Sequence, residues 1–397
     1  MSDKHCCVVG LGYIGLPCAI MLANAGCKVT GVDINEDLVR RINIGSVSVE
    51  DDLENILRAP SVLSNLTATT EIVTADVFIV AVPTPIHPQR KCAELSSLIS
   101  AVEAVLSVLK IGDLVIIEST LPPLTTRNVI QPILQQSGLR AGEDFFLAYC
   151  PERLMPGNIV YEIVHNNRVV GGVNYESSKR AAGVYSLFVK GSISVTDDVT
   201  AELCKLVENT YRDVNIALAN EISDVCSYIG VDAGEVIDLA NLHPRVSMLK
   251  PGIGVGGHCL PVDPWFIHEV LPYHSTMIAA ARRINGSRPA EIAAKIRGYV
   301  ASDMTQDFLI LGKTYKPEAT DTRESPAIEI IKNLQADGYR VHAYDPYVDV
   351  SSSLEAMAVN ARYIFVLVPH KRLLGELNAL LEKYEKTGNK KPDVICF

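Results

Sequence analysis

Short apolar runs separated by helix-like stretches recur through the first 200 or so residues of the chain. Each run suits a buried strand, and each stretch between two runs has room for a helix. Such alternation predicts βαβ units around a parallel sheet. The predicted strands are Cys6–Val9, Lys28–Val32, Val77–Val82, Leu114–Glu118, Phe145–Ala148 and Arg168–Val170, and residues 192–196 are expected to close the sheet.

The pattern changes at Thr200, where apolar side chains take up helical spacing with no Pro or Gly until Gly230. One long helix is the simplest interpretation. A helix over Ala233–Asn241, a loop rich in Gly and Pro, and more helix over Ile278–Gly286 are expected to follow. Strand and helix patterns then return, with predicted strands at Phe308–Leu311, Arg340–Tyr344, Tyr363–Val368 and Val394–Phe397 and a helix at Ala327–Ala336.

The predicted fold class is therefore α/β, with two Rossmann-like domains that have parallel sheets and are joined by a long central helix and a helical linker region. We expect domain boundaries at 1–199, 200–290 and 291–397. A chain of 397 residues, 48% of them hydrophobic, is long enough for more than one core.

Charge and cysteine usage narrow the function classes. The formal net charge of −10 gives no long-range attraction for nucleic acid or an anionic membrane, so an anionic ligand needs local basic residues. No apolar run is long enough to span a bilayer, and the first residues have no signal-peptide pattern. The ten cysteines lack C-x-x-C or zinc spacing, so we expect buried thiols in a cytoplasmic protein and no metal site.

A dinucleotide site is predicted at the first strand. Gly10, Gly12 and Gly15 form G-x-G-x-x-G between a strand and a helix, and Asp33 ends the next strand about 20 residues on. A carboxylate there suits the ribose hydroxyls of NAD and repels the extra phosphate of NADP. The alternative is a glycine-rich turn in another α/β protein. Two further segments, Pro83-Thr84-Pro85 and Ser119-Thr120, follow predicted strands at the edge where such sheets bind ligands.

Two other segments carry candidate chemistry. Lys205, Asn209 and Arg212 share one face of the long helix, although such a stripe on its own favours a solvated surface. Cys259 lies in GVGGHCLPVDP, where glycines leave the backbone open to a ligand. Most cysteines are packing residues, so spacing alone does not make Cys259 a nucleophile.

The combination of motifs resembles a known family. GLGYIGLP, VPTP, EST, YCPER, the K-x-x-x-N helix, PGIGVGGHCLPVDP and YKPEATDTRESP occur in the order found in the UDP-glucose/GDP-mannose dehydrogenase family, over essentially the whole chain. The resemblance implies NAD-dependent, four-electron oxidation of a UDP-sugar at its six-position hydroxymethyl group. HPRV at 243–246 and PWF at 264–266 look most like enzymes that oxidise UDP-N-acetyl-D-mannosamine for bacterial surface polysaccharides, with UDP-N-acetylglucosamine as the alternative UDP-N-acetylhexosamine.

The resemblance also implies roles for single residues. Cys259 is the nucleophile, Lys205 exchanges protons and with Asn209 stabilises the oxyanion, and the residues near the hydrolytic water are Glu152, Thr120 and Asp263. The NAD residues are Gly10, Gly12, Tyr13, Ile14, Gly15, Asp33, Pro83, Thr84, Thr120 and Arg323. The UDP-sugar residues, expected between domains, are Arg153, Leu154, Lys205, Asn209, Arg212, His243, Arg245, Gly256, Tyr315 and Lys316.

A dimer is expected, because a long helix between two α/β domains leaves an apolar face for a two-fold partner, whose sugar Arg245 would reach. The sequence departs from the family at Leu38, where a basic residue is common near the adenosine ribose; Arg40 is the possible substitute. Two other functions stay open. One is a non-catalytic NAD-binding sensor, and the other is a two-electron dehydrogenase of the 3-hydroxyacyl or 6-phosphogluconate type. The sensor is disfavoured by the presence together of Cys259, Lys205, Asn209, Glu152 and Asp263. Counting NADH per substrate separates the two enzymes.

Overall fold

The computed structural model describes residues 4–47, 51–154, 157–300, 307–387 and 390–397. The chain forms two compact units, which are considered separately. Unit 1 comprises Met1–Glu208 and Glu269–Leu271, and unit 2 comprises Asn209–His268 and Pro272–Phe397. Within the described ranges, no helix combines the length and the apolar character needed to cross a membrane.

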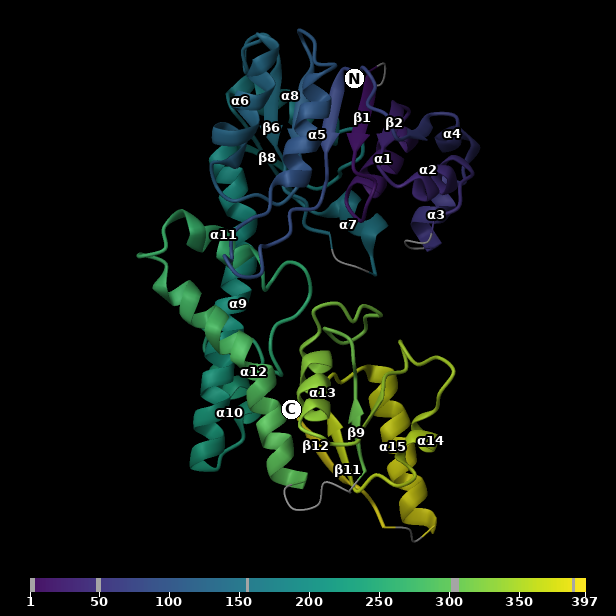
Figure 1. Ribbon diagram of the computed structural model, residues 1–397, viewed down its shortest axis with the longest axis vertical. Coiled ribbons are helices and arrows are strands. Elements are labelled where there is room, and N and C mark those ends of the chain that lie inside the picture. Colours follow the sequence, from purple (N-terminus) through teal and green to yellow (C-terminus); the bar gives the residue numbers. More distant parts are fainter. Residues whose placement is uncertain (1–3, 48–50, 155–156, 301–306, 388–389) are drawn as a thin grey trace. The chain divides into compact units, whose positions relative to one another are not determined.

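Unit 1 is built on an eight-stranded sheet of order β3-β2-β1-β4-β5-β6-β7-β8 (Figure 1). All neighbouring strands are parallel except β6 and β7, which are antiparallel. The sequence did not predict β3, an edge strand of Leu-Thr-Ala-Thr held by the side chain of Asn43 on Ala68. The strands are β1 (His5–Val9), β2 (Lys28–Val32), β3 (Leu66–Thr69), β4 (Val77–Val80), β5 (Leu114–Ile117), β6 (Phe146–Tyr149), β7 (Arg168–Gly172) and β8 (Ile193–Asp197).

Helices cover both faces of this sheet because successive strand residues point to opposite sides. Cys6 and Val8 pack with α1, α7 and α8 in one buried cluster, whereas Cys7 and Val9 pack with α5 and α6 in another. The α-helices that lie wholly in unit 1 are α1 (Gly15–Asn24), α2 (Glu36–Asn43), α3 (Asp51–Leu57), α4 (Pro60–Leu63), α5 (Ser96–Leu106), α6 (Gln131–Leu134), α7 (Ile159–His165) and α8 (Tyr175–Tyr185).

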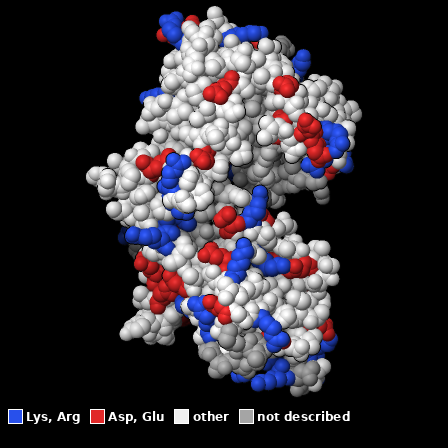
Figure 2. Space-filling model, in the orientation of Figure 1, with Lys and Arg blue, Asp and Glu red and all other residues white. Residues whose placement is uncertain are grey.

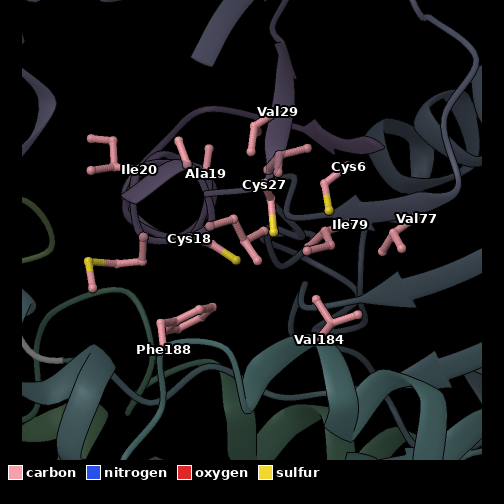
Figure 3. Close-up of a cluster of buried hydrophobic side chains, with 14 of the residues drawn as sticks. Cys6, Cys18, Ala19, Ile20, Cys27, Val29, Val77, Ile79, Val184 and Phe188 are labelled. Carbon is pink, nitrogen blue, oxygen red and sulfur yellow. The ribbon is translucent and has the colours of Figure 1, made fainter. Parts of the chain in front are cut away.

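Most of the cysteines serve as small core residues, as predicted. Figure 3 shows the thiols of Cys6, Cys18 and Cys27 inside the first cluster, among aliphatic side chains and near Phe188. Cys259 differs from them because it is exposed.

Four helices follow the first sheet: α9 (Asp198–Ile229), α10 (Ala233–Ala240), α11 (Asp263–Val270) and α12 (Thr276–Val300). The predicted long helix is confirmed as α9, and the boundary between the units falls within it. In contrast, α12 runs well past the predicted end at Gly286 and contains Pro289. Ile292 and Ile296 are buried in the core of unit 2, so burial of apolar surface outweighs the local preference of proline to end a helix.

Unit 2 also contains a parallel sheet, of order β10-β9-β11-β12 (Figure 1). Phe308 and Ile310 pack with α12 and α13, whereas Leu309 and Leu311 pack with α14 and α15. The predicted fold class is thus confirmed. The elements are β9 (Phe308–Leu311), α13 (Pro326–Ala336), β10 (Val341–Tyr344), α14 (Leu354–Ala358), β11 (Tyr363–Val366), α15 (Lys371–Thr387) and β12 (Asp393–Cys396).

The acidic excess does not gather into one field on the face drawn in Figure 2. Lys and Arg side chains are interspersed with Asp and Glu side chains on each unit. Any attraction of an anion on this face is therefore local, as the composition indicated.

Candidate functional site

The turn between β1 and α1 has the geometry of a phosphate-binding loop. Gly10 has a φ of 90°, and its N–H donates to Val32 O at 2.8 Å. A Cβ on Gly15 would lie 1.9 Å from Gly10 O, so only glycine permits this packing, whereas no described atom lies within 4 Å of a Cβ on Gly12. The open side at Gly12 and the start of α1 fit a pyrophosphate.

Asp33 lies beside this turn at the end of β2. Its Oδ2 accepts from Leu11 N at 2.8 Å and its Oδ1 from Asn35 N at 2.9 Å, and the side chain is only partly buried. Each carboxylate oxygen has a second lone pair, which suits ribose hydroxyls. Nearby, Leu38 packs against the core and Arg40 pairs with Asp37, so a ribose contact by Arg40 stays a prediction. Of the other predicted NAD residues here, Tyr13 is exposed and Ile14 is half-buried.

The loops after β4 and β5 lie together at the carboxyl edge of the sheet. Thr84 Oγ1 donates to Thr120 O at 2.6 Å, and Ser119 Oγ donates to Val82 O at 2.7 Å. Lys205, which is buried, donates from Nζ to Thr120 Oγ1. The structure therefore brings Lys205 of α9 to the edge that holds the predicted cofactor residues Pro83, Thr84 and Thr120.

Glu202 is a second residue of α9 at this edge, and sequence reasoning missed it. Its carboxylate is fully buried and accepts from Leu124 N at 2.6 Å and Thr126 N at 2.8 Å. Burial raises the pKa of Glu202 to about 7, against the opposing hydrogen bonds from Thr126. Leu124 has a φ of 74°, so Glu202 stabilises an unfavourable backbone in the loop after Thr120. The one sequence signal was its place one turn before Lys205.

Glu152 follows β6 at the same edge and is buried. Its Oε2 contacts Arg168 NH2 at 2.6 Å, and its Oε1 accepts from Arg153 N at 2.6 Å. The predicted substrate residue Arg153 donates from its side chain to Glu208 and to Asn167 O, and Leu154 packs against the core. Arg168 was not among the candidates, because one arginine at the start of a strand gives no signal in the sequence.

In unit 2, Cys259 lies on an exposed bend just before α11. The loop before it packs against the segment between β9 and α13. A Cβ on Gly256 would lie 2.4 Å from Glu324 O, and one on Gly257 would lie 3.0 Å from the ring of Tyr315. The glycines therefore permit this contact, and the loop of the predicted nucleophile is seated on a segment that carries predicted substrate residues.

Asn209, Arg212 and Asp263 form a chain of contacts in unit 2. Asn209 Nδ2 donates to Asp263 Oδ2, and Arg212 donates to Asn209 Oδ1. Asn209 and Asp263 are both buried. The contacts fix the Asn209 amide, and Asp263 begins α11 one turn after Cys259, whose carbonyl accepts from Asp263 N at 2.9 Å.

The remaining predicted substrate and cofactor residues of unit 2 are near its surface. His243 and Arg245 are exposed and contact each other on the loop after α10. Lys316 lies over the ring of Tyr315, with Nζ 5.8 Å from the centroid. Arg323 is held by Asp321, with NH2 2.7 Å from Oδ2, and its side chain is exposed.

Comparisons with known proteins match most of the chain. Models of the UDP-glucose/GDP-mannose dehydrogenase family match in three parts: the NAD-binding domain over residues 4–189, the central domain over 199–287 and the UDP-binding domain over 309–386.

Individual relatives are similar over most of their length. The UDP-N-acetyl-D-mannosamine dehydrogenase of Methanococcus maripaludis (strain C7) is 42% identical over 382 residues, covering 92% of this chain and 86% of that protein. The NDP-N-acetyl-D-galactosaminuronic acid dehydrogenase of Ralstonia nicotianae is 41% identical over 383 residues, covering 92% and 90%. The solved UDP-N-acetyl-D-mannosamine dehydrogenase of Pyrococcus horikoshii has a TM-score of 0.89 at 39% identity, covering 99% of this chain and 94% of that one.

Proposed function

The chain belongs to the UDP-glucose/GDP-mannose dehydrogenase family and is an NAD-dependent UDP-sugar dehydrogenase, and we propose that its substrate is UDP-N-acetyl-D-mannosamine, oxidised to the uronate. The observation that carries the proposal is the name shared by several relatives of about 42% identity and by a solved structure. The Ralstonia relative of similar identity makes an N-acetylgalactosamine nucleotide the second candidate. UDP-N-acetylglucosamine remains the third.

The proposed chemistry needs a group that holds the aldehyde between two oxidations. When bound, NAD accepts a hydride in each oxidation. Cys259 adds its sulfur to the aldehyde carbon, and oxidation of this thiohemiacetal gives a thioester. Hydrolysis then forms a C–O bond from water and breaks the C–S bond, with one water proton passing to a base and sulfur leaving as thiolate. The exposed bend that carries Cys259 supports access to a substrate.

The other roles follow from the contacts that hold each side chain. Lys205, fixed on Thr120, is proposed to exchange a proton with the reacting oxygen, and Asn209 to donate to that oxygen. Glu152 is proposed as the base for the hydrolytic water, with Thr120 and Asp263 orienting that water. Each of these side chains is buried or half-buried and contacts another polar group, which is the preorganisation that such roles need.

Basic residues are proposed to bind the nucleotide sugar. Guanidinium groups bind diphosphates and carboxylates in a bidentate manner, which suits Arg153, Arg212 and Arg245. Tyr315 contacts the loop that contains Gly256, and the Lys316 ammonium lies over the Tyr315 ring. The proposed set is completed by these two residues together with His243, Leu154 and Gly256. Arg323 is proposed to contact the NAD pyrophosphate.

The decisive experiment incubates the protein with NAD and, separately, with the UDP-linked N-acetylated forms of mannosamine, glucosamine and galactosamine. We expect UDP-N-acetyl-D-mannosamine to have the highest kcat/KM, with two NADH released per acid. A higher kcat/KM for either other sugar would refute the substrate assignment, and one NADH per product would refute the four-electron reaction.

The nucleophile is tested with a matched pair of variants. Cys259→Ala should abolish acid formation, whereas Cys396→Ala, which removes the other exposed cysteine of unit 2, should leave it intact. Mass spectrometry of the quenched wild type should find substrate attached to the peptide that contains Cys259. Acid formed by Cys259→Ala at a normal rate would exclude the covalent route.

We also propose that the protein is a dimer formed through α9. Apolar side chains recur on this helix at heptad and i+4 spacing, and each is at least a third exposed: Leu203, Val207, Tyr211, Leu218 and Val225. Such a stripe is typical of a covered surface. Sedimentation should give a dimer, and Leu218→Glu should convert it to monomer; a monomeric wild type at micromolar concentration would refute the proposal.

A further inference from the structure

Strand β7 is antiparallel to β6, and it brings an arginine to the edge of the unit 1 sheet where Thr120 and Glu152 lie. Ala148 pairs with Gly172 and Tyr149 with Gly171, so the first residue of β7 lies beyond the carboxyl end of β6. That residue is Arg168, and it reaches Glu152 after β6 and Glu118 after β5. A parallel β7 would have placed Arg168 at the opposite edge of the sheet.

Arg168 is fully enclosed by side chains of unit 1. Its guanidinium is 2.6 Å from Glu152 Oε2 and 3.6 Å from Glu118 Oε1. The ring of Tyr185 lies beneath it, with the centroid 4.6 Å from Cζ, and Tyr185 OH donates to Glu118 Oε1 at 2.7 Å. The Cys150 thiol also contacts Arg168, at 3.8 Å.

The charges of this cluster do not balance if both carboxylates are ionised. One guanidinium faces two buried carboxylates, and an uncompensated buried charge is costly. Burial is the main cause that raises the pKa of Glu118 to about 7; Glu152 adds to it, whereas Arg168, Tyr185 and Cys18 oppose it. Glu118 Oε2 has no hydrogen-bond partner among the described residues, so no hydrogen bond at this oxygen stabilises the charged form of Glu118.

We propose, on the premise of the function above, that Arg168 and Glu118 are positioning residues that hold the Glu152 carboxylate ready to accept a proton from the hydrolytic water. Arg168 binds one carboxylate oxygen and leaves it a second lone pair for that proton. Glu118 orients Arg168 from the other side. While Glu118 is protonated it carries no charge, so the Arg168 guanidinium forms its ion pair with Glu152 alone. Both residues are buried, so we assign them no contact with the substrate.

A single-turnover experiment separates this role from a purely structural one. The first phase of NADH formation reports oxidation, and loss of the Cys259 adduct, followed by mass, reports hydrolysis. Lysine keeps the charge of Arg168 but reaches only one partner, so Arg168→Lys should slow hydrolysis about tenfold and change the first phase by less than about twofold. The matched control is Arg282→Lys, which alters the buried Arg282–Asp213 pair of unit 2 and should not separate the two rates.

The pH profile tests Glu118 itself. Glutamine is neutral at every pH, so the hydrolysis rate of the wild type divided by that of Glu118→Gln should fall by about threefold or more between pH 6 and pH 9 as Glu118 loses its proton. This comparison also decides the matter if Arg168→Lys does not fold. The proposal is overturned by a ratio that is flat over this range, or by an Arg168→Lys enzyme in which both phases slow equally.

Glu152→Gln tells failure of this proposal from failure of the function. If this variant accumulates the adduct and Arg168→Lys does not, only the positioning role is wrong. If Glu152→Gln hydrolyses the adduct at the wild-type rate, Glu152 is not the base, and both proposals for this edge fail together.

Discussion

The two sheets of this protein begin with the same turn but use it differently. Gly10 ends β1 with a φ of 90° and donates to Val32 O, and Gly312 ends β9 with a φ of 89° and donates to Tyr344 O. In both, an aspartate at the end of the neighbouring strand accepts the next backbone N–H: Asp33 from Leu11 at 2.8 Å, and Asp345 from Lys313 at 2.7 Å.

The difference lies in what surrounds the aspartate. Asp33 is partly exposed, but Asp345 is fully buried and also contacts Tyr347 N and His370 Nε2, at 2.9 and 3.0 Å. At the position of Gly12, unit 2 has Thr314, whose buried hydroxyl donates to Lys316 O. The second turn therefore has neither an open carboxylate for ribose nor an open backbone for pyrophosphate.

The two turns also differ in how much chain follows them before the next helix begins. Helix α1 begins at Gly15, whereas α13 begins only at Pro326. The intervening segment carries Tyr315 and Arg323 and supports the Gly256 loop. One turn presents its backbone to a ligand, and the other is filled by its own side chains, so that a longer segment is held in place.

The largest effect is expected when the glycine common to both turns, Gly10 in unit 1 and Gly312 in unit 2, is replaced by alanine. A Cβ on Gly312 would lie 2.5 Å from Val368 Cβ, and one on Gly10 would lie 2.6 Å from Ala81 O. In Gly10→Ala and in Gly312→Ala, the strained left-handed backbone and the steric overlap of the new Cβ should together lower the free energy of unfolding by about 2–5 kcal/mol. Gly230→Ala has similar strain, at a φ of 80°, but no described atom within 4 Å, and should cost only about 1 kcal/mol. Urea unfolding that ranks Gly230→Ala with Gly312→Ala would contradict the steric argument.

The second effect separates the two aspartates. Asp345→Asn leaves buried N–H donors facing an amide and should cost about 2–4 kcal/mol of stability. Asp33→Asn should cost less than about 1 kcal/mol of stability but weaken NAD binding about tenfold, because a charge-assisted contact to ribose is lost. Urea unfolding and calorimetric titration with NAD measure the two quantities. An Asp345→Asn protein of wild-type stability, or an Asp33→Asn protein of wild-type affinity, would remove the distinction.

The sequence predicted these regions unequally, for physical reasons. The G-x-G-x-x-G turn and Asp33 carry a local signal, because their conformations require those residue types. Asp345 and His370 carry none, since their importance comes from burial and from contacts between distant strands. The same reason hid Arg168, because nothing in the sequence showed that β7 reverses direction. In α12, long-range packing overrode the local signal of Pro289.

A third and smaller effect concerns Gly12. Its Cβ position is open and its φ is not in the left-handed region, so Gly12→Ala should fold normally. The added methyl group lies where the pyrophosphate is proposed to approach, so NAD affinity should fall about tenfold. The free energy of unfolding should stay within about 1 kcal/mol of the wild-type value. Gly286→Ala, at another open glycine, controls for any general effect and should bind NAD as the wild type does. Unchanged NAD affinity in Gly12→Ala would place the pyrophosphate elsewhere.

The smallest effect is an opposite pH dependence of the two units. Burial raises the pKa of Glu118 and of Glu202, both in unit 1, to about 7. Their folded forms hold protons that the unfolded chain loses near its ordinary pKa of about 4.3. Unit 1 should therefore lose stability as pH rises from about 4 through 7.

Burial opposes the shift at Asp345 in unit 2, but hydrogen bonds from His370, Lys313 N and Tyr347 N outweigh it and lower the pKa to about 2. The stability that Asp345 contributes is therefore present above about pH 4 and is lost only as pH falls toward 2. Hydrogen exchange, corrected for the intrinsic effect of pH, should show reduced protection in the sheet of unit 1 at pH 8 relative to pH 5 and equal protection in the sheet of unit 2. Glu202→Gln should reduce the difference in unit 1, because glutamine keeps the uncharged state at both pH values. Equal changes in both sheets would mean that the buried carboxylates of unit 1 do not control its stability in this range.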